Sequence, residues 1–112
     1  MLDKQAILQV LIDSDRLNKY FHTDAIAQRI PLRIIKGTWY EEGIWLTKFG
    51  QPVQFIADKD ANGTYLAVLE LDIINNEATV KFRYPPEGIA GEARVEKEHM
   101  QWTVKSLTIH EQ

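Results

Sequence analysis

Apolar and polar residues alternate along the second half of the chain, in four successive runs between Thr64 and His110. Successive side chains of a strand point to opposite faces of a sheet, so a period of two predicts strands with one buried face. Four such runs in a row favour an antiparallel sheet. The positions expected on the buried face are Tyr65, Ala67, Leu69, Leu71 and Ile73 in the first run, Ala78, Val80, Phe82 and Tyr84 in the second, Ile89, Gly91, Ala93 and Val95 in the third, and Trp102 and Val104 in the fourth.

Turn-forming residues separate these runs. Asn75-Asn76 predicts a two-residue hairpin, because asparagine tolerates the positive φ that such turns need. Pro85-Pro86-Glu87-Gly88 separates the second strand from the third, since two prolines cannot sit in a central ladder. Glu98 to Gln101 forms the last turn. Before the first run, residues 58–63 (DKDANG) carry an Asn-Gly pair that is typical of a tight hairpin.

The apolar phase shifts within the last run. Trp102 and Val104 share one phase, whereas Leu107 and Ile109 share the other. An extra residue in one strand produces such a shift, so we expect a β-bulge between Lys105 and Leu107. Trp102 leads the inward phase and is expected in the core.

The N-terminal residues predict a helix. Asp3 is a good N-cap, because its carboxylate accepts hydrogen bonds from the free N–H groups of the first turn. The helix is expected from Lys4 to Asp13. It either extends to Phe21 or is followed by a short second helix that Asp13-Ser14-Asp15 re-caps. The face expected to cover the sheet contains Ala6, Ile7, Val10, Leu11 and Ser14.

The middle of the chain is irregular. Residues 22–30 fit no single element, and Pro31 ends any helix before it. Short strands are expected at Leu32–Lys36 and Val53–Ala57. The 112 residues are the length of one domain. The fold class predicted for residues 1–112 is therefore α+β, with the N-terminal helix packed on a curved antiparallel sheet of about five or six strands.

This layout resembles the cystatin-like cone of the nuclear transport factor superfamily and its small bacterial relatives. The residues that carry the resemblance are Ala78-Thr79-Val80-Lys81-Phe82, followed by Gln101-Trp102-Thr103-Val104 and Leu107-Thr108-Ile109. The resemblance covers residues 2–21 and 64–110, and it implies a curved meander under N-terminal helices. The superfamily contains isomerases, dehydratases, assembly modules and toxin-neutralising immunity proteins, so the resemblance alone implies no single activity. A simpler sheet with one helix across it is the competing layout.

Composition narrows the function classes. The chain has no cysteine, which excludes disulfides, thiolate catalysis and cysteine-ligated metal. Its net charge is −3 with no basic stripe, so we expect no nucleic-acid partner, while a basic protein partner fits. No apolar run approaches the ~20 residues that span a bilayer, and no leader pattern is visible. The compartment stays open: cytoplasmic as the sequence stands, periplasmic or lipid-anchored if a leader was removed. We expect no cofactor, and an oligomer remains possible in principle.

Catalytic candidates are weak. His22 with Asp24 fits a general base and its orienting carboxylate, but Asp24 fits a helix cap equally well. His22, His99 and His110 lack the spacing of metal ligands, so no metal site is predicted.

An aromatic and acidic stretch is the strongest candidate for a binding surface. Tryptophan and tyrosine dominate binding hot spots, and acidic neighbours suit a basic partner. We expect at least one of the two rings at 39 and 40 to be exposed, whereas Trp45 and Phe49 are interpreted as plugs at the open edge of the sheet. Pro86 and Glu87 lie in a stiff turn that is a second candidate surface. The candidate binding residues are Trp39, Tyr40, Glu41, Glu42, Pro86 and Glu87.

Three functional hypotheses follow. The first is a non-catalytic protein-binding domain, including an immunity-type inhibitor of a toxin. The second is a small-ligand-binding enzyme or carrier that uses the cavity of the cone. The third is an envelope or periplasmic domain.

Overall fold

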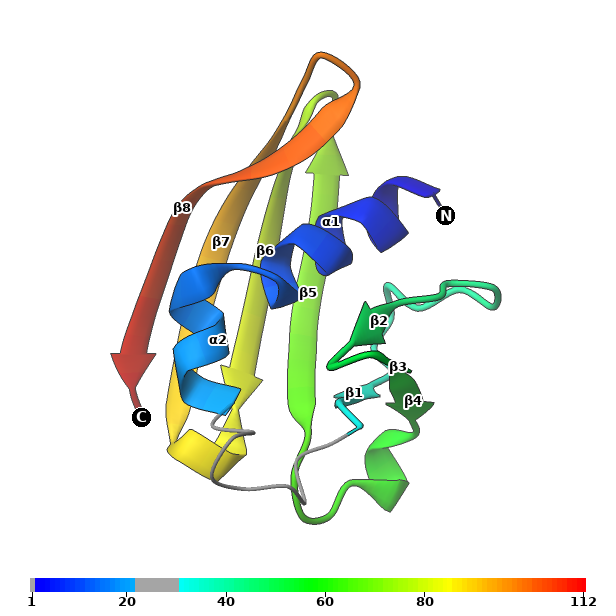
Figure 1. Ribbon diagram of the computed structural model, residues 1–112, viewed down its shortest axis with the longest axis vertical. Coiled ribbons are helices and arrows are strands. Elements are labelled where there is room, and N and C mark those ends of the chain that lie inside the picture. The colour runs from blue at the N-terminus through cyan, green and yellow to red at the C-terminus, as the bar shows by residue number, and fades with distance from the viewer. Residues whose placement is uncertain (1, 22–30) are drawn as a thin grey trace.

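The four alternating runs form the long strands of a six-stranded sheet. The structure is a computed structural model and describes residues 2–21 and 31–112. Figure 1 shows two helices on one face of the sheet and the long strands running side by side behind them. The helices are α1 (Leu2–Ile12) and α2 (Asp15–Phe21), and the long strands are β5 (Leu66–Ile74), β6 (Glu77–Tyr84), β7 (Ile89–Glu98) and β8 (Gln101–Glu111). The short elements are β1 (Arg33–Ile35), β2 (Thr47–Lys48), β3 (Gln51–Pro52), β4 (Gln54–Ile56) and the 3₁₀ turns η2 (Asp58–Asp60) and η3 (Pro85–Glu87).

The sheet is mixed, not purely antiparallel. Its strand order is β4-β1-β5-β6-β7-β8, and β1 runs parallel to both of its neighbours. The predicted α+β class is confirmed, and so are the short strands around 33–35 and 54–56. The hairpin predicted at 58–63 is wrong, because β4 pairs with β1 and does not contact β5 as a ladder neighbour. That segment instead passes through η2 and crosses to the far side of β1.

The predicted phase of β5 holds for only part of the strand. Val68 pairs with Phe82 and Glu70 pairs with Lys81, so Leu69 is an extra residue in the ladder. This bulge places Leu66 and Val68 in the core and turns Leu69 outward, where 54% of it is exposed. Alternation cannot show such a bulge when both phases carry apolar residues, as they do between 65 and 69.

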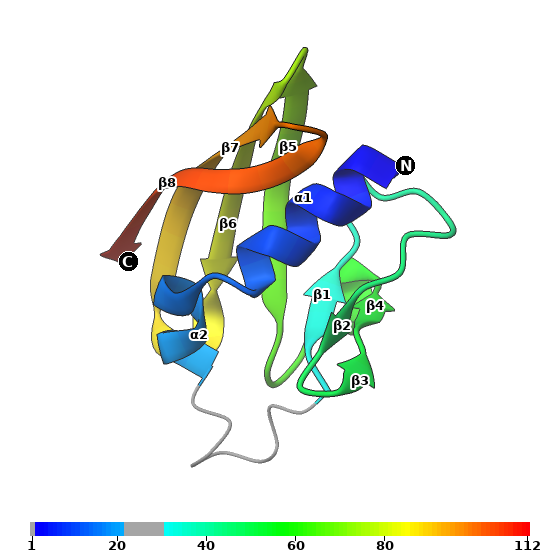
Figure 2. The ribbon, with the colours of Figure 1, turned by 45° about the horizontal axis from the view of Figure 1, so that its top comes forward.

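The other three long strands follow the predicted phase. The inward residues of β6 and β7 are buried, and the hairpin at Asn75-Asn76 forms with Asn75 at a φ of 56°. The bulge in β8 is confirmed, because Ser106 pairs with Arg94 and Val104 pairs with Val95, which leaves Lys105 without an opposite residue. Bulges increase local twist, and Figure 2 shows β8 curving over the helix face of the sheet.

The N-terminal segment forms two helices. Of the two predicted alternatives, the one with a short second helix after Asp13-Ser14-Asp15 is therefore confirmed. The helix break falls at 13–14, and the buried face of α1 consists of Ile7, Leu8, Leu11 and Ile12. This face is rotated from the expected one, because Ala6 and Val10 are only half-buried. Asp3 lies inside α1, so it is not the N-cap; its carboxylate accepts a hydrogen bond from the Trp102 indole at 3.1 Å.

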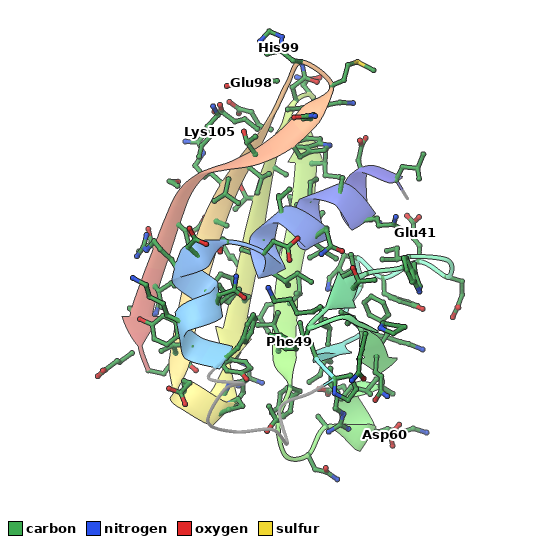
Figure 3. The ribbon with its side chains drawn as sticks, in the orientation of Figure 1. Glu41, Phe49, Asp60, Glu98, His99 and Lys105 are labelled. Atoms are coloured by element: carbon green, nitrogen blue, oxygen red, sulfur yellow. The ribbon has the colours of Figure 1, made fainter. Side chains whose placement is uncertain are left out.

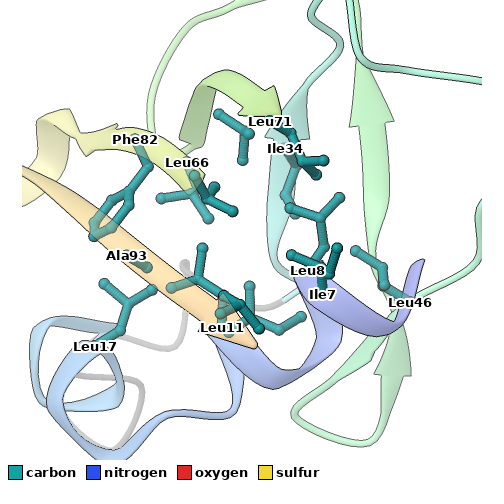
Figure 4. Packing of buried hydrophobic residues seen from close by; sticks show 14 of the residues in the cluster. Ile7, Leu8, Leu11, Leu17, Ile34, Leu46, Leu66, Leu71, Phe82 and Ala93 are labelled. Atoms are coloured by element: carbon teal, nitrogen blue, oxygen red, sulfur yellow. The ribbon is translucent and has the colours of Figure 1, made fainter. Parts of the chain in front are cut away.

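One cluster of buried side chains joins the helices and the sheet. Ile7, Leu11 and Leu17 are fully buried in the same cluster as Val80 and Phe82. Figure 4 shows the leucines and isoleucines of the helices facing Leu66, Phe82 and Ala93. We call the helix-covered side the inner face and the opposite side the outer face.

Gly91 shows how closely this inner face is packed. A Cβ atom at this position would lie 2.6 Å from the Phe82 ring and 2.6 Å from the backbone oxygen of Thr108. The backbone oxygen cannot move aside as a side chain can. Close approach between strands therefore explains this glycine, as expected from its inward position.

Trp102→Ala is expected to destabilise the protein by about 3–5 kcal/mol, the usual range for truncating a large buried aromatic side chain. Trp102 is only 5% exposed, and its loss leaves a void against α1. Urea denaturation measures the change. Trp45→Ala is the matched control, because that indole is 60% exposed and its removal should change stability by less than about 0.5 kcal/mol. Equal midpoints for the two variants would contradict the packing described here.

Candidate functional site

Residues 39–48 form an irregular segment that α1 holds in place. The Lys4 ammonium donates to the carbonyl oxygen of Trp39 at 2.9 Å and to the Glu41 carboxylate at 2.8 Å. One residue further along the helix, the Gln5 side-chain oxygen accepts the backbone N–H of Trp45 at 2.9 Å. Side chains of a regular helix therefore fix the backbone of a loop that has little secondary structure of its own.

The Gln9 side chain completes this attachment. Its amide nitrogen donates to the Thr47 carbonyl at 2.9 Å, and its amide oxygen accepts the Thr47 N–H at 3.1 Å. The Gln9 amide thus makes the same pair of hydrogen bonds to Thr47 that a backbone residue of a neighbouring strand would make. Lys48 adds an ion pair with Asp13 at 3.4 Å. The 39–48 segment is thus preorganised along the length of α1.

Trp39 is a core residue and not an exposed anchor. Its side chain is 4% exposed, and its indole N–H donates to the backbone oxygen of Val68 at 2.8 Å. Tyr40 is half-buried, with its ring centroid 5.2 Å from that of Phe55 and the Lys36 ammonium 4.9 Å from the ring. The expectation of a freely exposed ring at 39 or 40 is therefore wrong for Trp39, while Tyr40 presents only part of its ring.

Trp45 is the exposed tryptophan of the segment. Sixty per cent of it is accessible to solvent, which contradicts its interpretation as a plug. The reason is local alternation: Ile44 and Leu46 are 5% and 1% exposed, and the residue between two inward side chains of an extended chain points outward. This three-residue pattern is visible in the sequence and was the signal that the sequence interpretation missed.

Phe49 does pack against the body of the molecule. Its ring meets the Phe21 ring edge-on at a centroid distance of 5.6 Å, and it is half-buried. It lies at the turn between β2 and β3 with a φ of 56° (Figure 3). The interpretation of Phe49 as a covering ring agrees with this position.

The two glutamates of the segment, Glu41 and Glu42, are exposed. Figure 3 shows Glu41 on the outside of the loop near the start of α1. The hydrogen bond and the charge of Lys4 hold the pKa of Glu41 below its ordinary value. The Tyr40 hydroxyl bonds to Glu42 at 3.5 Å, and partial burial followed by the Glu42 charge raises the pKa of that tyrosine. The acidic rim is present, but Lys4 neutralises half of it.

Pro86 and Glu87 lie elsewhere. They form η3 with Gly88 in the left-handed conformation at its end, and both are half-buried. Figure 1 places this turn at the foot of β6 and β7, on the opposite side of the molecule from the 39–48 segment. The two predicted binding surfaces are therefore separate and do not form one continuous contact surface.

The weak catalytic candidates His22 and Asp24 lie outside the described residues. Among residues 2–21 and 31–112, no group of three histidine or acidic side chains is arranged to hold a metal ion. His99 occupies the turn between β7 and β8 (Figure 3). His110 is exposed on β8. The inner face of the sheet, where a cone would hold its ligand, is filled by fully buried side chains such as Leu66, Val80 and Phe82.

No protein-family model, no curated protein and no solved structure matches the chain. The resemblance to the cystatin-like cone therefore stays a prediction. Within the described part of the chain, the helices are too short and too polar to cross a bilayer.

Trp45→Phe is expected to remove most of the tryptophan fluorescence that acrylamide quenches. Trp39 and Trp102 are 4% and 5% exposed, so a solvent quencher reaches their indoles far less readily than that of Trp45. A Stern–Volmer titration of the parent and the variant measures the difference. An unchanged slope would show that a different indole is accessible.

Lys4→Met is expected to raise the pKa of Glu41 toward its ordinary value, because the hydrogen bond and charge of Lys4 are what lower it. A carboxylate with a lowered pKa stabilises the folded loop above its unfolded pKa, and this stabilisation is lost as the pH falls through the folded value. Carbon-detected NMR of the Glu41 carboxylate between pH 2 and 7 (roughly the range in which a glutamate titrates) measures both pKa values. Identical titration curves would show that the ion pair does not form in solution.

Proposed function

We propose that the chain is a non-catalytic protein-binding domain whose contact surface is the 39–48 segment, with Trp45 as its anchor. One observation carries the proposal: a large indole is 60% exposed on a segment whose backbone is tied to a helix at several points. A lone exposed leucine needs no explanation, but an exposed tryptophan on a fixed backbone is typical of a binding hot spot.

Preorganisation is the physical reason why this surface suits binding. Association loses free energy when loops and side chains become ordered at the interface. The bonds from Gln5 to Trp45 and from Gln9 to Thr47 order the segment before any partner arrives. Burial of the indole then contributes to affinity with little further loss of backbone freedom.

The proposal takes α1 as the platform of this surface. Ile7 and Leu11 are fully buried in the same cluster as Val80 and Trp102, which supports packing of α1 across a curved sheet. The polar residues Lys4, Gln5 and Gln9 of the same helix support the segment. One helix thus links the core to the contact surface.

The charge of the surface favours a basic partner. Glu41 and Glu42 are exposed residues of the segment, and the whole chain has a net charge of −3. Such charges mainly accelerate encounter, while the buried aromatic supplies affinity. An immunity-type inhibitor of a basic toxin fits this chemistry and is the narrower form of the proposal. The small-ligand and envelope alternatives stay predictions from the sequence.

A photo-crosslinking experiment tests the surface. The tagged chain carries p-benzoylphenylalanine in place of Trp45 in one variant and in place of Met100 in a matched control, and both are expressed in the source organism. Met100 is 86% exposed at the tip of the β7–β8 hairpin, so it is equally accessible but belongs to another surface. A protein crosslinked from position 45 and not from position 100 supports the proposal.

The affinity of the purified partner tests the anchor. Trp45→Ala is expected to weaken binding by about 2 kcal/mol or more, which is roughly a 30-fold rise in Kd, with no change in thermal stability. Isothermal titration calorimetry measures the change, and Met100→Ala should bind as the parent does. For the inhibitor form, co-expression of the partner should arrest growth only when the chain carries Trp45→Ala. A partner that binds both variants equally would refute Trp45 as the anchor.

A further inference from the structure

Strand β8 ends the sheet with a long free edge. It has 11 residues, and among the described strands it pairs with β7 alone (Figure 1). An edge strand presents unpaired N–H and C=O groups that can pair with another strand. The opposite edge is the three-residue strand β4, so β8 offers much the longer template.

The register shows which groups of β8 face outward. The N–H of Gln112 donates to the carbonyl of Gly88 at 2.8 Å, so residue 112 faces β7. Because backbone groups of neighbouring residues point in opposite directions along a strand, Leu107, Ile109 and Glu111 direct theirs to the free edge. The position of Arg16 agrees, since its guanidinium donates to the Leu107 carbonyl from outside the ladder.

We propose that a second copy of this chain pairs with the β8 edge, antiparallel, with the two-fold axis at Thr108. In this register Leu107 of each copy lies opposite Ile109 of the other. Both have outward backbone groups, so each such pair exchanges two hydrogen bonds. The proposal is independent of the function of the 39–48 segment.

Side-chain complementarity selects this register. Thr108 is exposed and faces its own equivalent across the axis. Leu107 and Ile109, which lie on the inner face, extend the apolar core across the seam. Apolar pairs directly across a ladder are stabilising, whereas an axis at Glu111 would place two like charges directly opposite each other.

The surroundings of the edge leave room for a partner. A hollow of about 320 Å³ between α2 and β8 runs along this edge, and its lining includes Ser14, Arg16, Lys105 and Leu107. The Ser14 hydroxyl is buried and has no hydrogen-bond partner within the described residues. The hollow therefore brings the Ser14 hydroxyl, which has no hydrogen-bond partner within the described residues, close to the unpaired edge of β8.

Two features limit the pairing to residues 105–111. The bulge at Lys105 bends the first half of β8 away from a straight ladder. Arg16 occupies the Leu107 carbonyl, so a second copy has to displace its guanidinium. Arg16 thus competes with self-association, and its removal should favour the dimer.

Sedimentation-velocity measurements over a concentration series of the full chain test the proposal. The parent should show a reversible monomer–dimer equilibrium. Thr108→Lys should weaken the dimer by about tenfold or more, because two lysines then meet at the axis. Thr103→Lys is the matched control: it is also exposed on β8 and also opposite a glutamate of β7, but it lies outside the overlap, so its dimer should equal that of the parent.

Charge exchange identifies the axis itself. An equimolar mixture of Thr108→Lys and Thr108→Glu should recover the dimer that each variant alone has lost, while thermal melts show that both remain folded. Arg16→Ala should strengthen the parent dimer by about fivefold or more, as expected when a competing charge-assisted hydrogen bond is removed. A parent and an Arg16→Ala variant that both stay monomeric at the highest concentration would overturn the proposal. So would a dimer that Thr108→Lys leaves intact.

Discussion

The two-way hydrogen bond between the Gln9 side chain and the backbone of Thr47 connects the two halves of the molecule. On one side of α1, Ile7 and Leu11 are fully buried in the hydrophobic core cluster. On the other side, the amide of Gln9 supplies the donor and acceptor that an irregular segment lacks. Buried or half-buried backbone groups need such partners, and this pairing satisfies both backbone groups of Thr47.

The dual role of α1 explains why its apolar face differs from the expected one. The sequence predicts a helix from the spacing of Ala6, Ile7, Val10 and Leu11, and the helix is present. The spacing of apolar residues alone predicts that the polar face of this helix is exposed to solvent. Here the polar side chains of Gln5 and Gln9 bond to the backbone of the 39–48 segment. The orientation of α1 about its axis therefore satisfies contacts on two faces, the apolar one and the polar one. This orientation depends on a segment almost 40 residues away and is not encoded locally.

The long strands were predictable because most inward positions of β6, β7 and β8 are apolar and most outward positions are polar, down to the bulge at Lys105. The mixed part of the sheet was not. Strands β1 and β4 have three residues each, too few for a period, and their parallel pairing joins segments distant in sequence. The exposure of Trp39 and Trp45 was mispredicted for a related reason: the two aromatic residues look alike in composition, and only the buried neighbours Ile44 and Leu46 reveal which indole is outward.

The hydrogen bond between Asp3 and Trp102 joins residues 99 positions apart and connects α1 with β8. A chain synthesised from its N-terminus makes α1 first and its β8 partner last. During that interval the buried face of α1 has no complete sheet to cover it, and exposed apolar surface of this kind promotes aggregation. Contacts between distant parts of a chain also form slowly, because a long loop must close before they are gained. The first helix of this protein is therefore the element most in need of protection while the rest is being made.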